Sequence, residues 1–148
     1  MPTERDIARD AATEIRDLHR FLVGWLGGQL PRTAEAFSRF SDVFDPDFAI
    51  FAPNGIVVRR DDLVRNLESA HGGYADNDPA FVIRIENIET RRIWKDHALM
   101  GYEEWQDLPG GTTARQSSVV LTTAPGAPHA LRWLHLHETW IEGHAPPD

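Results

Sequence analysis

The sequence predicts an α+β fold, in which three helices pack on one face of a strongly bent antiparallel sheet. Apolar residues recur every three or four positions in the first half of the chain, which is typical of amphipathic helices. In the second half, long β-rich segments alternate with turn residues, which is typical of an antiparallel meander. Because 148 residues suffice for one core, we expect a single domain over residues 1–148.

Two helices are expected to open the chain. The first carries its apolar face from Ile7 to Leu26, with Thr3 as its N-cap and Gly27-Gly28 as its stop. A second helix can be capped by Thr33 and ends before Pro46. Their aromatic residues are expected to serve mainly as core.

A short hairpin and a third helix should follow. The segments "FAIF" and "IVV" flank "PNG", where Asn54-Gly55 can form a tight reversal. Asn54 is therefore first a turn residue, although it can also reach the mouth of a pocket. Asp61 can cap the third helix, and Gly72-Gly73 can end it.

The remaining chain should form four long strands, over residues 81–93, 98–106, 113–123 and 130–142. The order of elements is then α-α-β-β-α-β-β-β-β. Helices on one face of such a bent sheet enclose a cone-shaped space. Residues 143–148, "GHAPPD", are expected to form a loose tail.

Composition disfavours several classes of function. The net charge of −8 and the scattered basic residues argue against nucleic-acid binding. No apolar run approaches the roughly 20 residues of a membrane span, and the charged N-terminus lacks the features of a secretory signal, so a cytoplasmic protein is expected. The absence of cysteine excludes disulfides and thiolate chemistry.

The stretch "LRWLHLHETW" draws attention to His135 and His137. Strand alternation would place both rings on one side of the sheet. They could line a ligand pocket, hydrogen-bond to neighbouring strands or a partner subunit, or bind a metal with His97 or Glu104. A closed set of metal ligands is missing, so we expect neither a metal nor a cofactor.

Neighbouring strands offer further polar groups. Alternation puts Tyr102 and Glu104 on one face of their strand, and Arg115 and Ser117 on one face of the next. If these faces and His135 all point inward, they form a small-molecule site. Alternatively, Glu104 and Arg115 form an ion pair on the outer face.

The candidate residues divide into two groups. The candidate catalytic residues are His135, His137, Tyr102 and Glu104, and the candidate ligand-binding residues are Arg115, Ser117, Trp133, Trp25 and Asn54. Imidazole, phenol and carboxyl groups can donate and accept protons, which suits acid–base chemistry in a partly apolar pocket.

The order of elements and the last strand resemble the NTF2-like superfamily, in particular its SnoaL-like and DUF4440-like members. Those members often end in a strand patterned Trp-Arg-x-x-His-x-His-x-Ser. In this chain Leu131 stands at the Trp position, Arg132, His135 and His137 match, and Thr139 replaces Ser. The resemblance implies a cone-shaped fold with an internal pocket.

The resemblance leaves the reaction open, because this superfamily hosts many activities. Ketosteroid-isomerase-like members carry a general-base Asp immediately before a Pro, where this chain has Ala52 before Pro53. An alanine cannot abstract a proton, so that mechanism is not carried over.

Three hypotheses of function therefore remain. The chain is a small-molecule-binding protein, a cofactor-independent isomerase, cyclase or dehydratase of the SnoaL-like kind, or an oligomerisation module. Segments such as "RIENIETRRIW" and "EEWQ" mix aromatic, aliphatic and charged residues on the outer sheet face. These segments predict a homodimer through that face.

Overall fold

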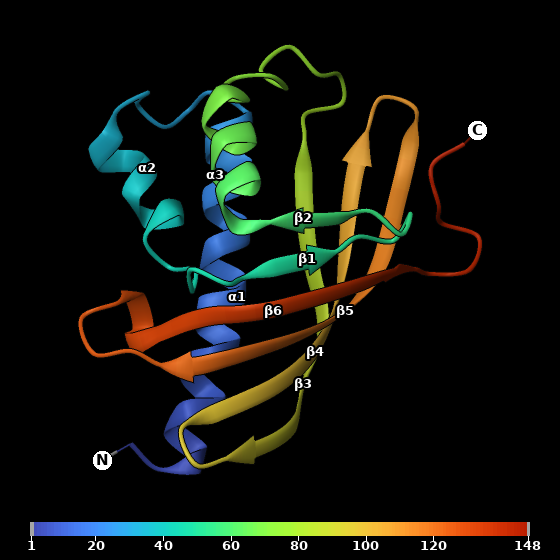
Figure 1. Cartoon of the computed structure of the whole chain (residues 1–148). Coiled ribbons are helices and arrows are strands. Elements are labelled where there is room, and N and C mark those ends of the chain that lie inside the picture. Colours follow the sequence, from blue (N-terminus) through green and yellow to red (C-terminus); the bar gives the residue numbers. More distant parts are fainter. Residues whose placement is uncertain (1, 148) are drawn as a thin grey trace.

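In this computed structural model, which describes residues 2–147, three α-helices lie against one six-stranded sheet (Figure 1). The helices are α1 (Glu4–Leu26), α2 (Ala34–Ser41) and α3 (Arg60–Ser69). The strands are β1 (Ala49–Phe51), β2 (Val57–Arg59), β3 (Val82–Trp94), β4 (His97–Leu108), β5 (Gly111–Thr123) and β6 (Leu131–Trp140), with a 3-10 turn, η1 (Pro128–Ala130), before β6. The predicted α+β cone and its order of elements are confirmed.

The sheet is mixed, whereas the sequence predicted a wholly antiparallel one. Its strand order is β2-β1-β6-β5-β4-β3, and β1 runs parallel to β6. The parallel pairing begins in the segment after α2, which runs alongside the start of β6. There the Trp133 amide donates to the Val43 carbonyl over 2.8 Å, and the Asp45 amide donates to the Trp133 carbonyl over 2.9 Å. Helix α2 ends at Ser41, before Pro46.

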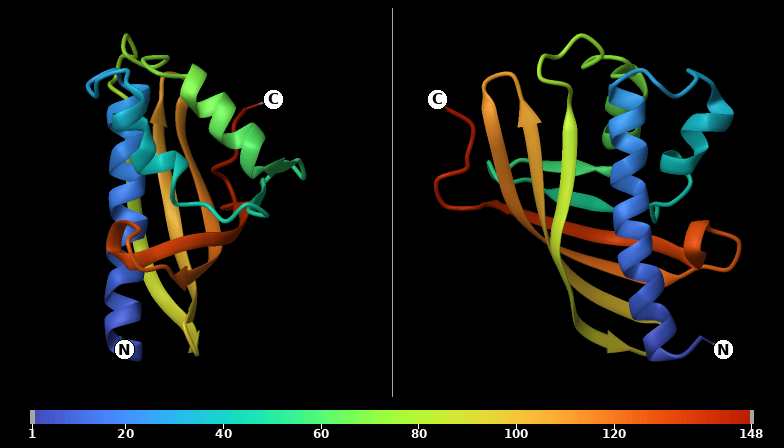
Figure 2. Two further views of the ribbon diagram at one scale, coloured as in Figure 1. Left: turned by 60° about the vertical axis from the view of Figure 1, so that its left-hand side comes forward. Right: turned by 180° about the vertical axis from the view of Figure 1, so that it is seen from behind.

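Helix α1 lies along one side of the curved sheet, and α2 and α3 gather around its C-terminal half (Figure 2). The predicted cap is present, because Thr3 and Asp6 form a reciprocal capping box. Trp25 is only 1% exposed, and its indole N–H donates to the Leu67 carbonyl of α3 over 2.8 Å. Trp25 therefore serves the core, where it ties α1 to α3. In the part of the chain that the structure describes, no helix is both long and apolar enough to cross a membrane.

Helix α3 begins slightly before its predicted cap. Its N-cap is Arg59, and Asp61 lies in its first turn together with Asp62. Acidic residues in a first turn interact favourably with the helix dipole. The segment after β6 was expected to be loose, but it makes a backbone hydrogen bond to β5. The His144 carbonyl accepts this bond from the Ala114 amide over 3.0 Å.

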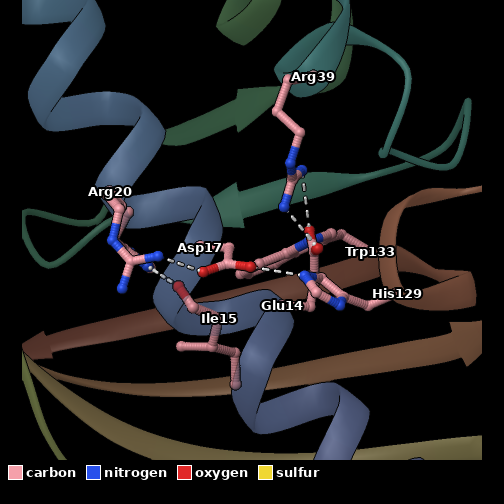
Figure 3. Close-up of polar contacts among 8 residues, drawn as sticks. Glu14, Ile15, Asp17, Arg20, Arg39, His129 and Trp133 are labelled. Atoms are coloured by element: carbon pink, nitrogen blue, oxygen red, sulfur yellow. Dashed lines mark hydrogen bonds and ion pairs between the residues drawn. The ribbon is translucent and has the colours of Figure 1, made fainter.

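A buried carboxylate joins three elements of the fold. Glu14 of α1 is fully buried and accepts hydrogen bonds from Arg39 of α2, the shorter at 2.7 Å, and from the indole of Trp133 of β6 at 2.9 Å (Figure 3). Burial raises the pKa of Glu14, while the bonds from Trp133 and Arg39 oppose that rise. Beside it, Asp17 accepts from Arg20 and His129 at the surface.

We expect Glu14→Ala to lower the free energy of unfolding by about 3 kcal/mol, because it leaves the buried donor of Trp133 and the Arg39 guanidinium without their acceptor. Glu14→Gln should lower it less, since its carbonyl can still accept one bond. Urea denaturation measures both effects. Asp62→Ala, which removes an exposed pair with Arg65, is the control and should change stability by less than about 1 kcal/mol. Equal effects of the three substitutions would contradict this account of Glu14.

Candidate functional site

The last strand does not keep a simple alternation. Val120 of β5 pairs with His135, whereas the next residue, Leu121, pairs with Trp133. Leu134 is therefore an extra residue on β6, which makes a β-bulge. Because strand side chains alternate, one extra residue reverses which side chains face the helices from this point onward.

The bulge places the histidine pair on the outer face of the sheet. Beyond it, Leu136 and Glu138 face the cone, and the rings of His135 and His137 pack beside Phe51 of β1, with centroid distances of 5.0 and 5.6 Å. His135 and His137 therefore do not line the pocket, which was one of the positions that the sequence left open for them. Their roles as catalytic residues have no support from their position.

A cavity of about 270 Å³ lies between the helices and the concave face of the sheet. Its walls are mostly apolar and include Leu18, Leu22, Phe44, Phe48, Leu67 and Leu136. Apart from Tyr74, the polar side chains that line it form one cluster: His19 of α1, Glu104 and Gln106 of β4, Arg115 of β5 and Glu138 of β6. The cavity thus combines apolar walls with a cluster of ionisable side chains.

Several predicted site residues do come together here. Glu104 and Arg115 sit opposite each other on β4 and β5, and both line the cavity, as does Trp133. The outer-face ion pair that the sequence left open is therefore not formed. Tyr102 and Ser117 also pair across these strands and are buried, but neither side chain is part of the wall of this cavity.

Two predicted ligand-binding residues lie elsewhere. Asn54 stays in the β1–β2 turn, where its side-chain oxygen accepts a hydrogen bond from the Ile56 amide over 3.0 Å. Trp25 is packed in the core against Phe37 and His71. Turn formation and core packing account for these two side chains.

Sequence reasoning missed His19, which holds Glu104 in place. Its Nε2 lies 2.9 Å from a Glu104 oxygen, and its Nδ1 lies 2.7 Å from the Ile15 carbonyl. A carbonyl only accepts hydrogen bonds, so Nδ1 carries a proton. The second oxygen of Glu104 accepts from the Gln106 amide.

The charges of this pair follow from its contacts. Burial alone would lower the pKa of His19, but the Glu104 carboxylate outweighs burial and raises it. Burial likewise opposes ionisation of Glu104, yet the charge and hydrogen bond of His19 lower the pKa of Glu104 to about 2. Each partner therefore favours the charged form of the other, imidazolium for His19 and carboxylate for Glu104.

Sequence reasoning also missed Glu138, whose pKa is shifted in the opposite direction to that of Glu104. Burial first, and the neighbouring Glu104 charge second, raise the pKa of Glu138 to about 7, against the opposing charge of Arg115. Its contact with Arg115 is long, at 3.5 Å between Nη1 and the carboxyl oxygen. The cavity thus holds one carboxyl that is ionised and another that titrates near neutral pH.

Across residues 2–147, no group of three or more His, Asp or Glu side chains is arranged to hold a metal ion. His97, which the sequence left open as a ligand, lies at the start of β4 beside Asp96 and stacks on Trp94.

Comparisons with known proteins agree with this fold. A family model described as sucrose-6-phosphate phosphohydrolase C-terminal matches residues 11–142. Sucrose-phosphatase 1 of Nicotiana tabacum is 26% identical over 143 residues, which cover 93% of this chain but only 32% of that protein. The chain therefore spans about a third of the length of this relative.

Solved structures of other proteins share this fold. An NTF-2-like protein of unknown function from Pseudomonas aeruginosa has a TM-score of 0.77 and 27% identity, over 89% of this chain and 98% of that one. The CaMKII hub of S. rosetta has a TM-score of 0.67 at 12% identity, over 90% of this chain and 95% of that one. The fold is NTF2-like.

The state of Glu138 predicts a pH dependence of folding. Its pKa is raised from an ordinary 4.5 to about 7 in the folded protein. The protonated carboxyl therefore stabilises the folded state fully below about pH 4.5, and this stabilisation is lost as pH rises through 7. Relative to Glu138→Gln, the wild-type free energy of unfolding should fall over this range by up to about 3 kcal/mol. Urea denaturation from pH 4.5 to 8 measures it. Glu142→Gln, at an exposed site, is the control, and curves for wild type and Glu138→Gln that stay parallel would contradict the assignment.

Proposed function

Because the chain belongs to the sucrose-6-phosphate phosphohydrolase C-terminal family and has an NTF2-like fold, we propose that it binds a small molecule inside its cone. The observation that carries the proposal is the cavity of about 270 Å³, which has apolar walls and a polar cluster. Small-molecule sites are usually built in this way, with apolar walls for affinity and a few polar groups for orientation.

Unsatisfied polar atoms support a bound ligand. The Nε of Arg115 is buried and has no hydrogen-bond partner in the described part of the chain, and the contact of Arg115 with Glu138 is long. A buried donor without a partner destabilises a fold by about 1–3 kcal/mol, so such groups are normally satisfied by protein, water or ligand. A ligand with an acceptor group near Arg115 meets this need.

The phosphatase activity in the relatives' names is not assigned to this chain. A sugar phosphate carries hydroxyl groups on nearly every carbon, and each needs a hydrogen-bond partner when it is buried. The cavity offers mainly leucine and phenylalanine side chains, and apart from Tyr74 its polar residues are limited to one cluster. Its chemistry suits a ligand with an apolar body.

Acid–base catalysis of the SnoaL-like kind is the second candidate function, and the state of Glu138 favours it. A carboxyl with a pKa of about 7 can both give and take a proton at neutral pH, while Glu104 beside it stays ionised. Environments that push the pKa values of two carboxyls apart are typical of acid–base sites. In this candidate, Glu138 and Glu104 carry the chemistry without the histidine pair.

We also propose a cytoplasmic homodimer that associates through the outer face of the sheet. Phe51 is 41% exposed on this face and adjoins both histidines of β6. An exposed aromatic beside two imidazoles suits burial against a second copy, where the ring nitrogens can find partners.

The dimer should appear by sedimentation as twice the 16.7 kDa chain mass, and Phe51→Lys should shift it to the monomer, because a buried lysine charge opposes association. Arg5→Ala, near the start of α1 and exposed, is the control and should leave the mass unchanged. A monomeric wild type at tens of micromolar, a rough limit for stable association, would overturn this proposal.

Filling the cavity tests the main proposal. N-phenyl-1-naphthylamine, a neutral probe that fluoresces in apolar surroundings, should bind with saturation at one site per chain. Leu63→Trp, in the cavity wall on α3, should weaken its binding at least about tenfold, since lost contact area weakens apolar binding. The control is Arg65→Trp, which introduces the same residue on the exposed side of the same helix. Equal binding by the two variants would place the probe outside the cavity.

A further inference from the structure

The polar cluster of the cavity contains one positive charge that is poorly matched. Glu104 is neutralised by His19, and its second oxygen accepts from Gln106. Arg115 is held over the ring of Trp140, with its guanidinium carbon 4.8 Å from the ring centroid. Its orientation is therefore fixed before any ligand arrives.

Arg115 has spare hydrogen-bonding capacity. A guanidinium has five N–H donors, and the contact with Glu138 at 3.5 Å is longer than the 2.7–2.9 Å typical of a charged hydrogen bond. Its Nε donor is buried and unpaired among residues 2–147. The Arg115 side chain is only 18% exposed, so water outside the cavity solvates it little.

The groups around Glu138 determine how it responds to an anion. His19 faces it from α1, Tyr102 and Glu104 from β4, and Arg115 from β5. In the state in which His19 and Glu138 are protonated and Glu104 is ionised, the charges of His19, Arg115 and Glu104 sum to +1. One anionic group then neutralises the cluster, and the hydroxyl of the protonated Glu138 can donate to it.

We propose that the ligand of this cavity is an apolar monocarboxylate, whose carboxylate binds between Arg115 and the protonated carboxyl of Glu138. This inference rests on the pocket proposed above and adds the chemical class of its ligand. The apolar wall residues, such as Leu22 and Phe48, contact the body of the ligand. Charge-assisted bonds from a guanidinium are the contacts that carboxylates favour most in proteins.

Binding should then be coupled to proton uptake. Above pH 7 the free protein carries Glu138 mainly as a carboxylate, so Glu138 must take up a proton from solution when the anion binds. Below pH 7 the proton is already present. Affinity for the carboxylate should therefore fall about fivefold between pH 7 and pH 8, while a neutral analogue should show little change.

The experiment compares three probes that share one body: 4-phenylbutyrate, 4-phenylbutan-1-ol and 4-phenylbutylamine. Isothermal titration calorimetry at pH 6, 7 and 8, in buffers of different ionisation enthalpy, reports affinity and proton uptake together. We expect 4-phenylbutyrate to bind at least about tenfold more tightly than the alcohol at pH 6, with proton uptake at pH 8.

Two variants assign these effects to residues. Arg115→Gln should remove the preference for the carboxylate over the alcohol. Glu138→Gln should remove the pH dependence, because an amide still donates a hydrogen bond but does not titrate. Glu142→Gln, at an exposed site, should behave as wild type, and thermal unfolding checks that each variant is folded.

The outcomes separate this inference from the pocket itself. Tighter binding of the alcohol or the amine than of the carboxylate overturns the carboxylate assignment, even if N-phenyl-1-naphthylamine still occupies the cavity. Carboxylate binding that survives unchanged in Arg115→Gln also overturns it. If neither the carboxylate nor N-phenyl-1-naphthylamine binds, both the pocket and its ligand class are wrong.

Discussion

The chemistry of the cavity depends on the ion pair between His19 and Glu104. By bringing an imidazole to within 2.9 Å of a buried carboxylate, α1 allows Glu104 to remain ionised in a place where burial opposes charge. Burial, and second the charge of Glu104 beside it, raise the pKa of Glu138 to about 7. One contact between the first helix and the fourth strand thus orders the charges of the whole cluster.

The α+β fold could be predicted because its signals are local. The periodicity of α1, its cap at Thr3 and the turn at Asn54-Gly55 depend on residues close in sequence, and each has its expected structure. The parallel pairing of β1 with β6 has no such signal, since it follows from hydrogen bonds between residues about 90 apart, such as Val43 and Trp133.

The candidate site could be predicted only in part, for the same reason. Where β4 and β5 pair without interruption, alternation correctly put Tyr102, Glu104, Arg115 and Ser117 on one face. In β6 the bulge at Leu134 reversed the faces, so the prominent histidines pointed outward and Glu138 inward. A bulge depends on the partner strand and leaves little trace in one sequence.

A polar residue within an apolar helical stripe was a signal that could have been used. Glu14 lies one turn before Leu18, and His19 lies one turn after Ile15, so both lie beside buried positions of α1. Polar side chains at such positions need partners, and both have them: Arg39 and Trp133 for Glu14, and Glu104 for His19. Each of these contacts connects residues far apart in the sequence.

The bulge at Leu134 has a consequence for how this fold can diverge. Removing a single residue there would exchange the two faces of the rest of β6, so that imidazoles would enter the cone and Glu138 would leave it. An insertion or deletion of one codon can thus replace the acidic chemistry of the pocket with basic chemistry, and at the same time change the surface beside Phe51. In this chain, the bulge at Leu134 therefore decides, together with the identity of the β6 residues, which side chains line the pocket.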